Sequence, residues 1–109
     1  MTYIEELQDM IRHRYGVESV HLESVPVKET SEGKTIWEGN VEVFELENYP
    51  KAPKAYVWSY ATFDPKRPLH VSVLHVPPIS SPVQAVRAAI MEESRAREAA
   101  EAKPDGSQS

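Results

Sequence analysis

The stretch KAYVWSYATF (residues 54–63), with DPKRP (64–68) and LHVSVLHV (69–76) after it, decides the fold. The two outer segments are rich in aromatic and β-branched residues, which favour strands. The segment between them combines aspartate with prolines, which favours a turn. Together they predict an antiparallel hairpin with strands over 54–63 and 69–76.

The sequence before this hairpin predicts a helix over residues 3–15. Thr2 and Glu5 have the spacing of a capping box, in which a hydroxyl and a carboxylate satisfy the first free N–H groups. Gly16 stands where a helix commonly ends on a left-handed residue. Apolar residues recur between these two signals at helical spacing, so one face of the helix is expected to pack on a core.

Two further strands are expected between this helix and the hairpin. Apolar residues alternate up to Leu22 and resume in the opposite phase at Val25, which predicts a bulge near Glu23. The segment SEGK (31–34) favours a turn, and a second strand is expected over about 35–47.

The sequence after the hairpin predicts a second helix over 82–102. Pro77-Pro78 ends the last strand, Ser81 suits the N-cap, and Pro82 suits the first helical position. The final residues, 104–109, contain proline and glycine and no apolar side chain, so we expect a flexible C-terminal tail.

These elements predict the α+β class, in the order helix, four-stranded antiparallel meander, helix. A two-layer sandwich with both helices on one sheet face is the most economical way to cover the apolar sides. The chain of 109 residues suits a single domain. We assign residues 1–103 to that α+β domain.

Composition excludes several classes of function. The chain has no cysteine, which excludes disulfides, thiolate metal sites and thiol catalysis. Its four histidines lack the spacing of a metal site, and its isolated glycines form no phosphate-binding loop, so we expect neither metal nor cofactor. No run approaches the roughly 18 apolar residues of a membrane span. The start of the chain does not resemble a secretory signal, so we expect a cytoplasmic protein.

Charge is distributed unevenly along the chain. The net charge of −5 disfavours nonspecific binding to nucleic acid. Residues 1–50 hold eleven acids and four bases, whereas residues 51–80 hold one acid and four bases. The only basic segment therefore coincides with the aromatic hairpin.

A symmetric turn in this hairpin predicts a candidate binding face. It places the large rings of one strand beside an imidazole and a hydroxyl of the other, while the opposite face is small and aliphatic and suits helix packing. Exposed aromatic patches on small domains are often contact surfaces. With the cations at its rim, the predicted binding set is Tyr56, Trp58, Tyr60, His70, Ser72, Lys54, Lys66 and Arg67.

We therefore expect a small non-enzymatic interaction or accessory protein that binds a protein partner through this face. One alternative is a small nucleotide- or ligand-handling enzyme with His70 in its site. Another is a homodimer formed through the same face. Ser72 shares a strand with His70, but no nucleophile-elbow motif surrounds it, so we assign no catalytic residue.

Overall fold

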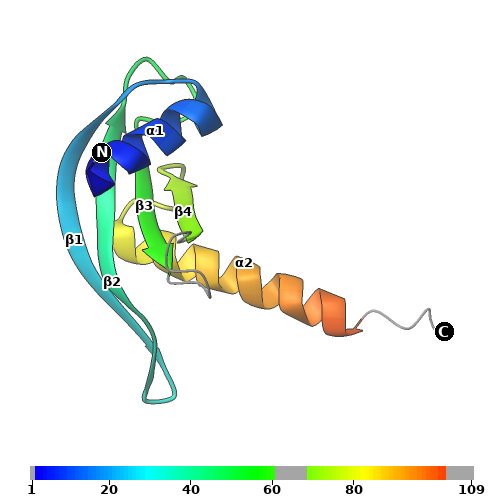
Figure 1. Cartoon of the computed structure of the whole chain (residues 1–109). Helices are drawn as coiled ribbons and strands as arrows, with labels where there is room; N and C mark the ends of the chain where they lie inside the picture. Colours follow the sequence, from blue (N-terminus) through cyan, green and yellow to red (C-terminus); the bar gives the residue numbers. More distant parts are fainter. Residues whose placement is uncertain (1, 61–68, 103–109) are drawn as a thin grey trace.

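A computed structural model describes residues 2–60 and 69–102. The elements are α1 (Tyr3–Tyr15), β1 (Ser19–Ser31), β2 (Lys34–Leu46), β3 (Lys54–Tyr60), β4 (Leu69–Leu74) and α2 (Pro82–Ala102). The four strands form one antiparallel sheet in the order β1-β2-β3-β4 (Figure 1). The predicted α+β class and meander are confirmed. The predicted turn at 64–68 and the predicted tail at 104–109 lie outside the described residues.

Both helices begin where the capping signals predict. The backbone N–H of Glu5 donates to the Thr2 hydroxyl at 3.2 Å, and the Thr2 N–H donates to the Glu5 carboxylate at 2.9 Å. Gly16 ends α1 in the left-handed conformation, with φ of 72°. At the start of α2, the hydroxyl of Ser81 accepts from the backbone N–H of Gln84 at 3.2 Å.

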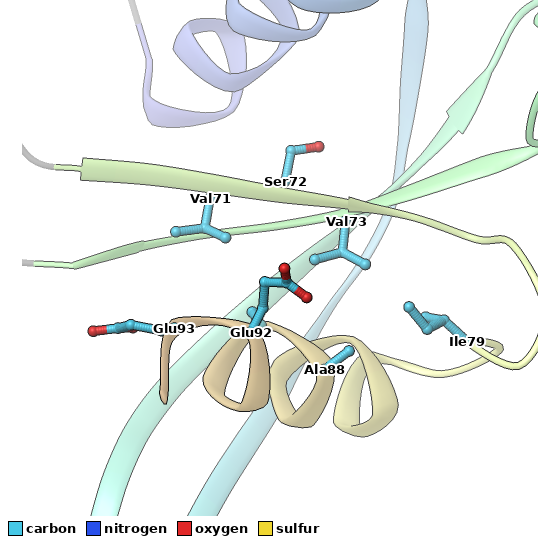
Figure 2. Close-up of a pocket in the computed structure, with 8 residues that line it drawn as sticks. Val71, Ser72, Val73, Ile79, Ala88, Glu92 and Glu93 are labelled. Carbon is cyan, nitrogen blue, oxygen red and sulfur yellow. The ribbon is translucent and has the colours of Figure 1, made fainter. Parts of the chain in front are cut away.

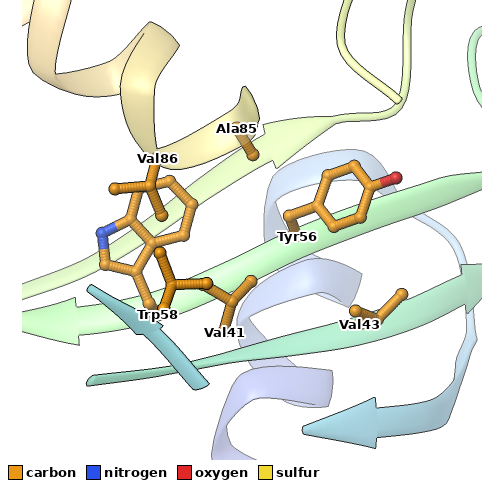
Figure 3. Close-up of a cluster of buried hydrophobic side chains, with 7 residues drawn as sticks. Val41, Val43, Tyr56, Trp58, Ala85 and Val86 are labelled. Carbon is orange, nitrogen blue, oxygen red and sulfur yellow. The ribbon is translucent and has the colours of Figure 1, made fainter. Parts of the chain in front are cut away.

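The two helices lie on opposite faces of the sheet, which corrects the expectation that both cover one face. On one face, Leu7 and Ile11 of α1 pack in a cluster with Val57. On the other face, Val86 of α2 packs in a cluster with Trp58 (Figure 3). Neighbouring strand residues point to opposite faces, so the sheet lies between the helices. An apolar stripe shows that a helix needs a partner but does not specify which face of the sheet provides it.

The register of β3 and β4 also differs from the expected one. Trp58 pairs with Val71, whereas a symmetric turn predicts Leu74 as its partner. The pairing is therefore shifted by three residues. Because side chains alternate with a period of two, an odd shift changes which residues of β4 share a face with the large rings.

The long hairpin of β1 and β2 follows the sequence signals more closely. Glu32 and Gly33 form its turn with φ of 52° and 79°, the left-handed region that turn residues adopt. The register shifts between His21 and Glu23, which confirms the predicted bulge. A second shift, between Glu29 and Thr30, lies close to the turn.

Candidate binding surface at the β4 edge

The aromatic residues predicted to form an open binding face are part of the core. Trp58 has an exposed fraction of 0%, and that of Tyr56 is 3%. Both lie beneath α2, beside Ala85 and Val86 (Figure 3). Tyr60 is half-buried and packs against the same cluster. The expectation of an exposed aromatic surface is therefore wrong, because α2 covers the face that was expected to stay open.

The polar end of Tyr56 is paired inside the fold. Its hydroxyl lies 2.6 Å from Nδ1 of His75. Burial raises the pKa of this phenol, and the negative charge of Glu23 raises it further. This hydroxyl therefore stays neutral at pH 7 and acts as a structural hydrogen-bonding group.

His70 and Ser72 lie on the face that α1 covers, not with the aromatic rings. Nδ1 of His70 lies 2.6 Å from the hydroxyl of Ser59, which lies 2.7 Å from the hydroxyl of Tyr3. The hydroxyl of Ser72 lies 2.8 Å from that of Tyr15. Two tyrosines of α1 thus attach the helix to serines of β3 and β4. The sequence did not indicate Ser59 as a partner of His70, because a symmetric turn pairs Ser59 with a different residue of β4.

The Ser59–His70 pair has part of the geometry of a nucleophile and its base. A catalytic pair also needs a third group that orients the base. Within the described residues, no hydrogen bond joins His70 to a carboxylate. Attachment of α1 accounts for the contacts that are present.

Of the three cations predicted to rim the binding face, only Lys54 lies within the described residues. Lys54 is half-buried and lies opposite Glu45 in the β2–β3 register. Lys66 and Arg67 lie outside the described residues. The candidate site therefore has to be built from other groups.

A buried carboxylate occurs on β2. Glu42 has an exposed fraction of 5%. It lies 2.8 Å from Nε2 of His21 and also accepts from the hydroxyl of Ser24. Across the described ranges, no group of three or more histidine, aspartate or glutamate side chains could hold a metal ion. Because His21 and Ser24 lie on β1 and Glu42 lies on β2, these hydrogen bonds fasten the two strands beside the bulge.

The free edge of β4 is the feature most suited to binding. β4 is the last strand of the sheet, and no described strand pairs with its outer side. Its sequence, LHVSVL, carries no charged residue and no proline. Its register with β3 contains no bulge. Natural edge strands are usually protected by charges, prolines or bulges, because unpaired backbone groups attract other strands. β4 has none of these within its length.

The backbone groups at this edge follow from the hydrogen-bond pattern. The N–H of His75 donates to the carbonyl of Lys54 at 2.9 Å, in the same register as the β3–β4 pairs. Because bonded and non-bonded pairs alternate, Val73 and Val71 turn their backbone groups toward β3. The Leu74 carbonyl accepts from the N–H of Val76. The groups left at the edge are the N–H and C=O of His70 and Ser72 and the N–H of Leu74.

An apolar groove of about 500 Å³ lies between β4 and α2, beside this edge (Figure 2). It is open along one side. The residues that line it are Val71, Ser72, Val73, Ile79, Ala88, Ala89, Glu92 and Glu93. In Figure 2, Val71 and Val73 point toward α2, whereas Ser72 points toward α1. The free edge and the groove thus offer backbone hydrogen bonds and apolar contacts side by side.

No protein-family profile, curated protein or solved structure matches this chain. Among the described helices, none is long and apolar enough to cross a membrane. The argument for function therefore depends on the geometry of the surface itself. The signal that could have identified this surface is a short uncharged strand followed by a helix with small residues.

Proposed function

We propose that the protein is a small non-enzymatic interaction or accessory protein that binds a partner segment as an added strand along β4. One observation carries the proposal: an unprotected strand edge lies directly beside an open apolar groove. In strand addition, main-chain hydrogen bonds supply affinity, and pockets for alternate side chains supply specificity. The fold needs no oxidising compartment, since the chain has no cysteine that could form disulfides, and we propose a cytoplasmic location.

The alternative of an enzyme with His70 in its site has weaker support. One nitrogen of this ring is occupied by Ser59, and the neighbouring hydroxyls hold α1 in place. The alternative of a homodimer through the aromatic face would require exposed rings, whereas α2 covers them. Binding of a strand at the β4 edge, by contrast, requires no rearrangement of the described fold.

The test selects random peptides displayed on phage against the wild-type protein and then compares two substitutions at one position. Ser72→Ala removes the hydroxyl that contacts Tyr15 but retains the edge N–H. Ser72→Pro removes the edge N–H as well, and proline is tolerated where that group faces solvent. We expect selected peptides to bind Ser72→Ala with nearly wild-type affinity. With Ser72→Pro we expect them to lose about tenfold or more, measured by fluorescence anisotropy.

A second measurement guards against misfolding of the proline variant. Methylation of alternate backbone nitrogens in a selected peptide removes its own donors, so it should weaken binding to the wild-type protein. Alternate nitrogens form two sets, and only one set faces β4. If methylation of neither set weakens binding, strand addition is contradicted. Equal binding of peptides to Ser72→Pro and Ser72→Ala would place the binding surface elsewhere.

A further inference from the structure

The groove beside β4 is mainly apolar. Most of the surface that lines it comes from the aliphatic side chains of Val71, Val73, Ile79, Ala88 and Ala89. Glu92 also lies at the groove, but its side chain is 79% exposed, and its carboxylate lies 3.8 Å from Nη1 of Arg95. A carboxylate this exposed stays hydrated, so the wall of the groove favours apolar side chains.

The C-terminal half of α2 continues past the free edge of β4 (Figure 1). Arg87 contacts Glu29 of β1, whereas Glu92 lies beside β4, so the helix crosses the sheet from one edge toward the other. From Glu92 to its end at Ala102 the helix rises by about 15 Å. Neighbouring strands lie about 4.8 Å apart. The helix is therefore long enough to cover a strand added along β4.

Side chains of such an added strand alternate between two different environments. Those on one face lie beside Val71 and Val73, which point toward α2 and the groove (Figure 2). Those on the other face lie beside His70 and Ser72, which already contact hydroxyl groups of the fold. Hydroxyl-bearing side chains form favourable cross-strand pairs with such neighbours. The occupant that fits both faces is aliphatic on one side and polar on the other.

We infer that the partner is an extended segment of another protein in which aliphatic and polar residues alternate, with its aliphatic side chains in the groove beneath α2. This inference rests on the proposed function, since it names the occupant of the same edge. It is carried by the apolar groove on one face of β4, the polar side chains on the other, and the helix that continues past the edge.

A second copy of this chain fits the edge less well. In a two-fold symmetric antiparallel pairing of β4 with β4, both α2 helices lie on the same face of the joined sheet. Each helix continues past its own β4 and would enter the space over the sheet of the other copy. That sheet face is already covered by the other copy's α2, so the two helices would compete for the same space. A segment without a helix of its own avoids this conflict.

The experiment titrates ¹⁵N-labelled full-length protein with two synthetic peptides of equal composition. In the first, Ac-Thr-Val-Thr-Val-Thr-Val-Thr, the two residue types alternate. In the second, Ac-Thr-Thr-Val-Val-Val-Thr-Thr, the valines are consecutive, so they cannot all face α2. Both peptides end in the same Gly-Lys-Lys tail for solubility. We expect the first to shift the amide signals of His70, Ser72 and Leu74, and to bind about tenfold more tightly than the second.

Filling the groove gives the matched comparison on the protein. Ala88 lies on α2 across the groove from Val73 (Figure 2). Ala88→Phe should remove the preference for the alternating peptide, because the ring occupies the space of the valines. Met91→Phe, on the same helix, should leave the preference unchanged, since Met91 is 59% exposed and lies outside the groove. Each preference is a ratio of two affinities of one variant, so a general loss of stability does not imitate this result.

Three results of these titrations would overturn the inference. The first is equal or tighter binding of the peptide with consecutive valines. The second is binding of neither peptide. The third is an unchanged preference in Ala88→Phe, since the valines would then lie outside the groove.

Two outcomes separate this inference from the proposed function. If phage-selected peptides require the Ser72 N–H but lack alternating aliphatic residues, the inference fails and strand addition stands. If no peptide depends on the Ser72 N–H, both fail. A concentration-dependent dimer of the wild-type protein, measured by sedimentation and abolished by Ser72→Pro but not by Ser72→Ala, would make the occupant a second copy and would also overturn the inference.

Discussion

The two edges of the sheet are built differently. β1 forms one edge with 13 residues, two register shifts, Pro26 and several charged side chains. β4 forms the other edge with 6 residues that include neither charge nor proline, and its register is regular. β1 is also fastened to α2, since Arg87 donates to Glu29 at 2.9 Å. The first edge carries the features that discourage pairing, and the second carries none of them.

The comparison shows that exposed aliphatic side chains do not by themselves make a strand edge suitable for binding another strand. β1 exposes Val20 and Leu22, with exposed fractions of 44% and 45%. The bulge at Leu22 interrupts the regular edge that a partner strand would need. β4 combines a regular edge with an apolar groove. The proposed function therefore places binding at regular backbone geometry beside a groove, and not at exposed aliphatic residues alone.

The largest expected effect concerns the core that supports the β4 edge. Trp58→Ala should lower the free energy of unfolding by about 3–5 kcal/mol, because it leaves a cavity beneath α2. Val20→Ala at the β1 edge should cost less than about 1 kcal/mol, since its side chain is partly exposed. Denaturant titration of both variants measures the difference. Similar small costs for the two would contradict the buried aromatic face and restore the expectation of an open one.

A smaller effect tests which way the Ser72 side chain points. Tyr15→Phe and Ser72→Ala each remove one partner of the same hydrogen bond, so each should cost about 1 kcal/mol. The double variant should cost about as much as either single variant, because the bond is lost only once. Thermal or denaturant unfolding of all four proteins gives the coupling free energy. Fully additive costs would mean that the Ser72 side chain does not contact α1 and points toward α2 instead.

Local features of the fold could be read from the sequence. Thr2 and Glu5 form the capping box that their spacing predicts, and Ser81 caps α2. The bulge near Glu23 follows from a change of phase within one strand. Each of these features depends on residues close together in the chain, so the pattern contains the information needed.

The candidate site could not be read in the same way, because it depends on a register and on a choice of face. The assumption of a symmetric turn shifted β4 by three residues and placed His70 and Ser72 with the aromatic rings. The choice between the two faces for α2 is decided by packing of Ala85 and Val86 over Trp58. Neither the register of two strands nor the face that a helix covers can be read from residues close together in the chain. One wrong register therefore moved the predicted site onto residues that form the core.

The most direct test of the central claim is amide hydrogen exchange along β4, with and without a bound peptide. In the free protein, the amides of Ser72 and His70 should exchange rapidly, whereas those of Val71 and Val73 should be protected by β3. Saturation with a selected peptide should slow exchange at Ser72 by about tenfold or more. Protection of Ser72 in the free protein, or unchanged exchange in the saturated complex, would contradict an open edge that binds by strand addition.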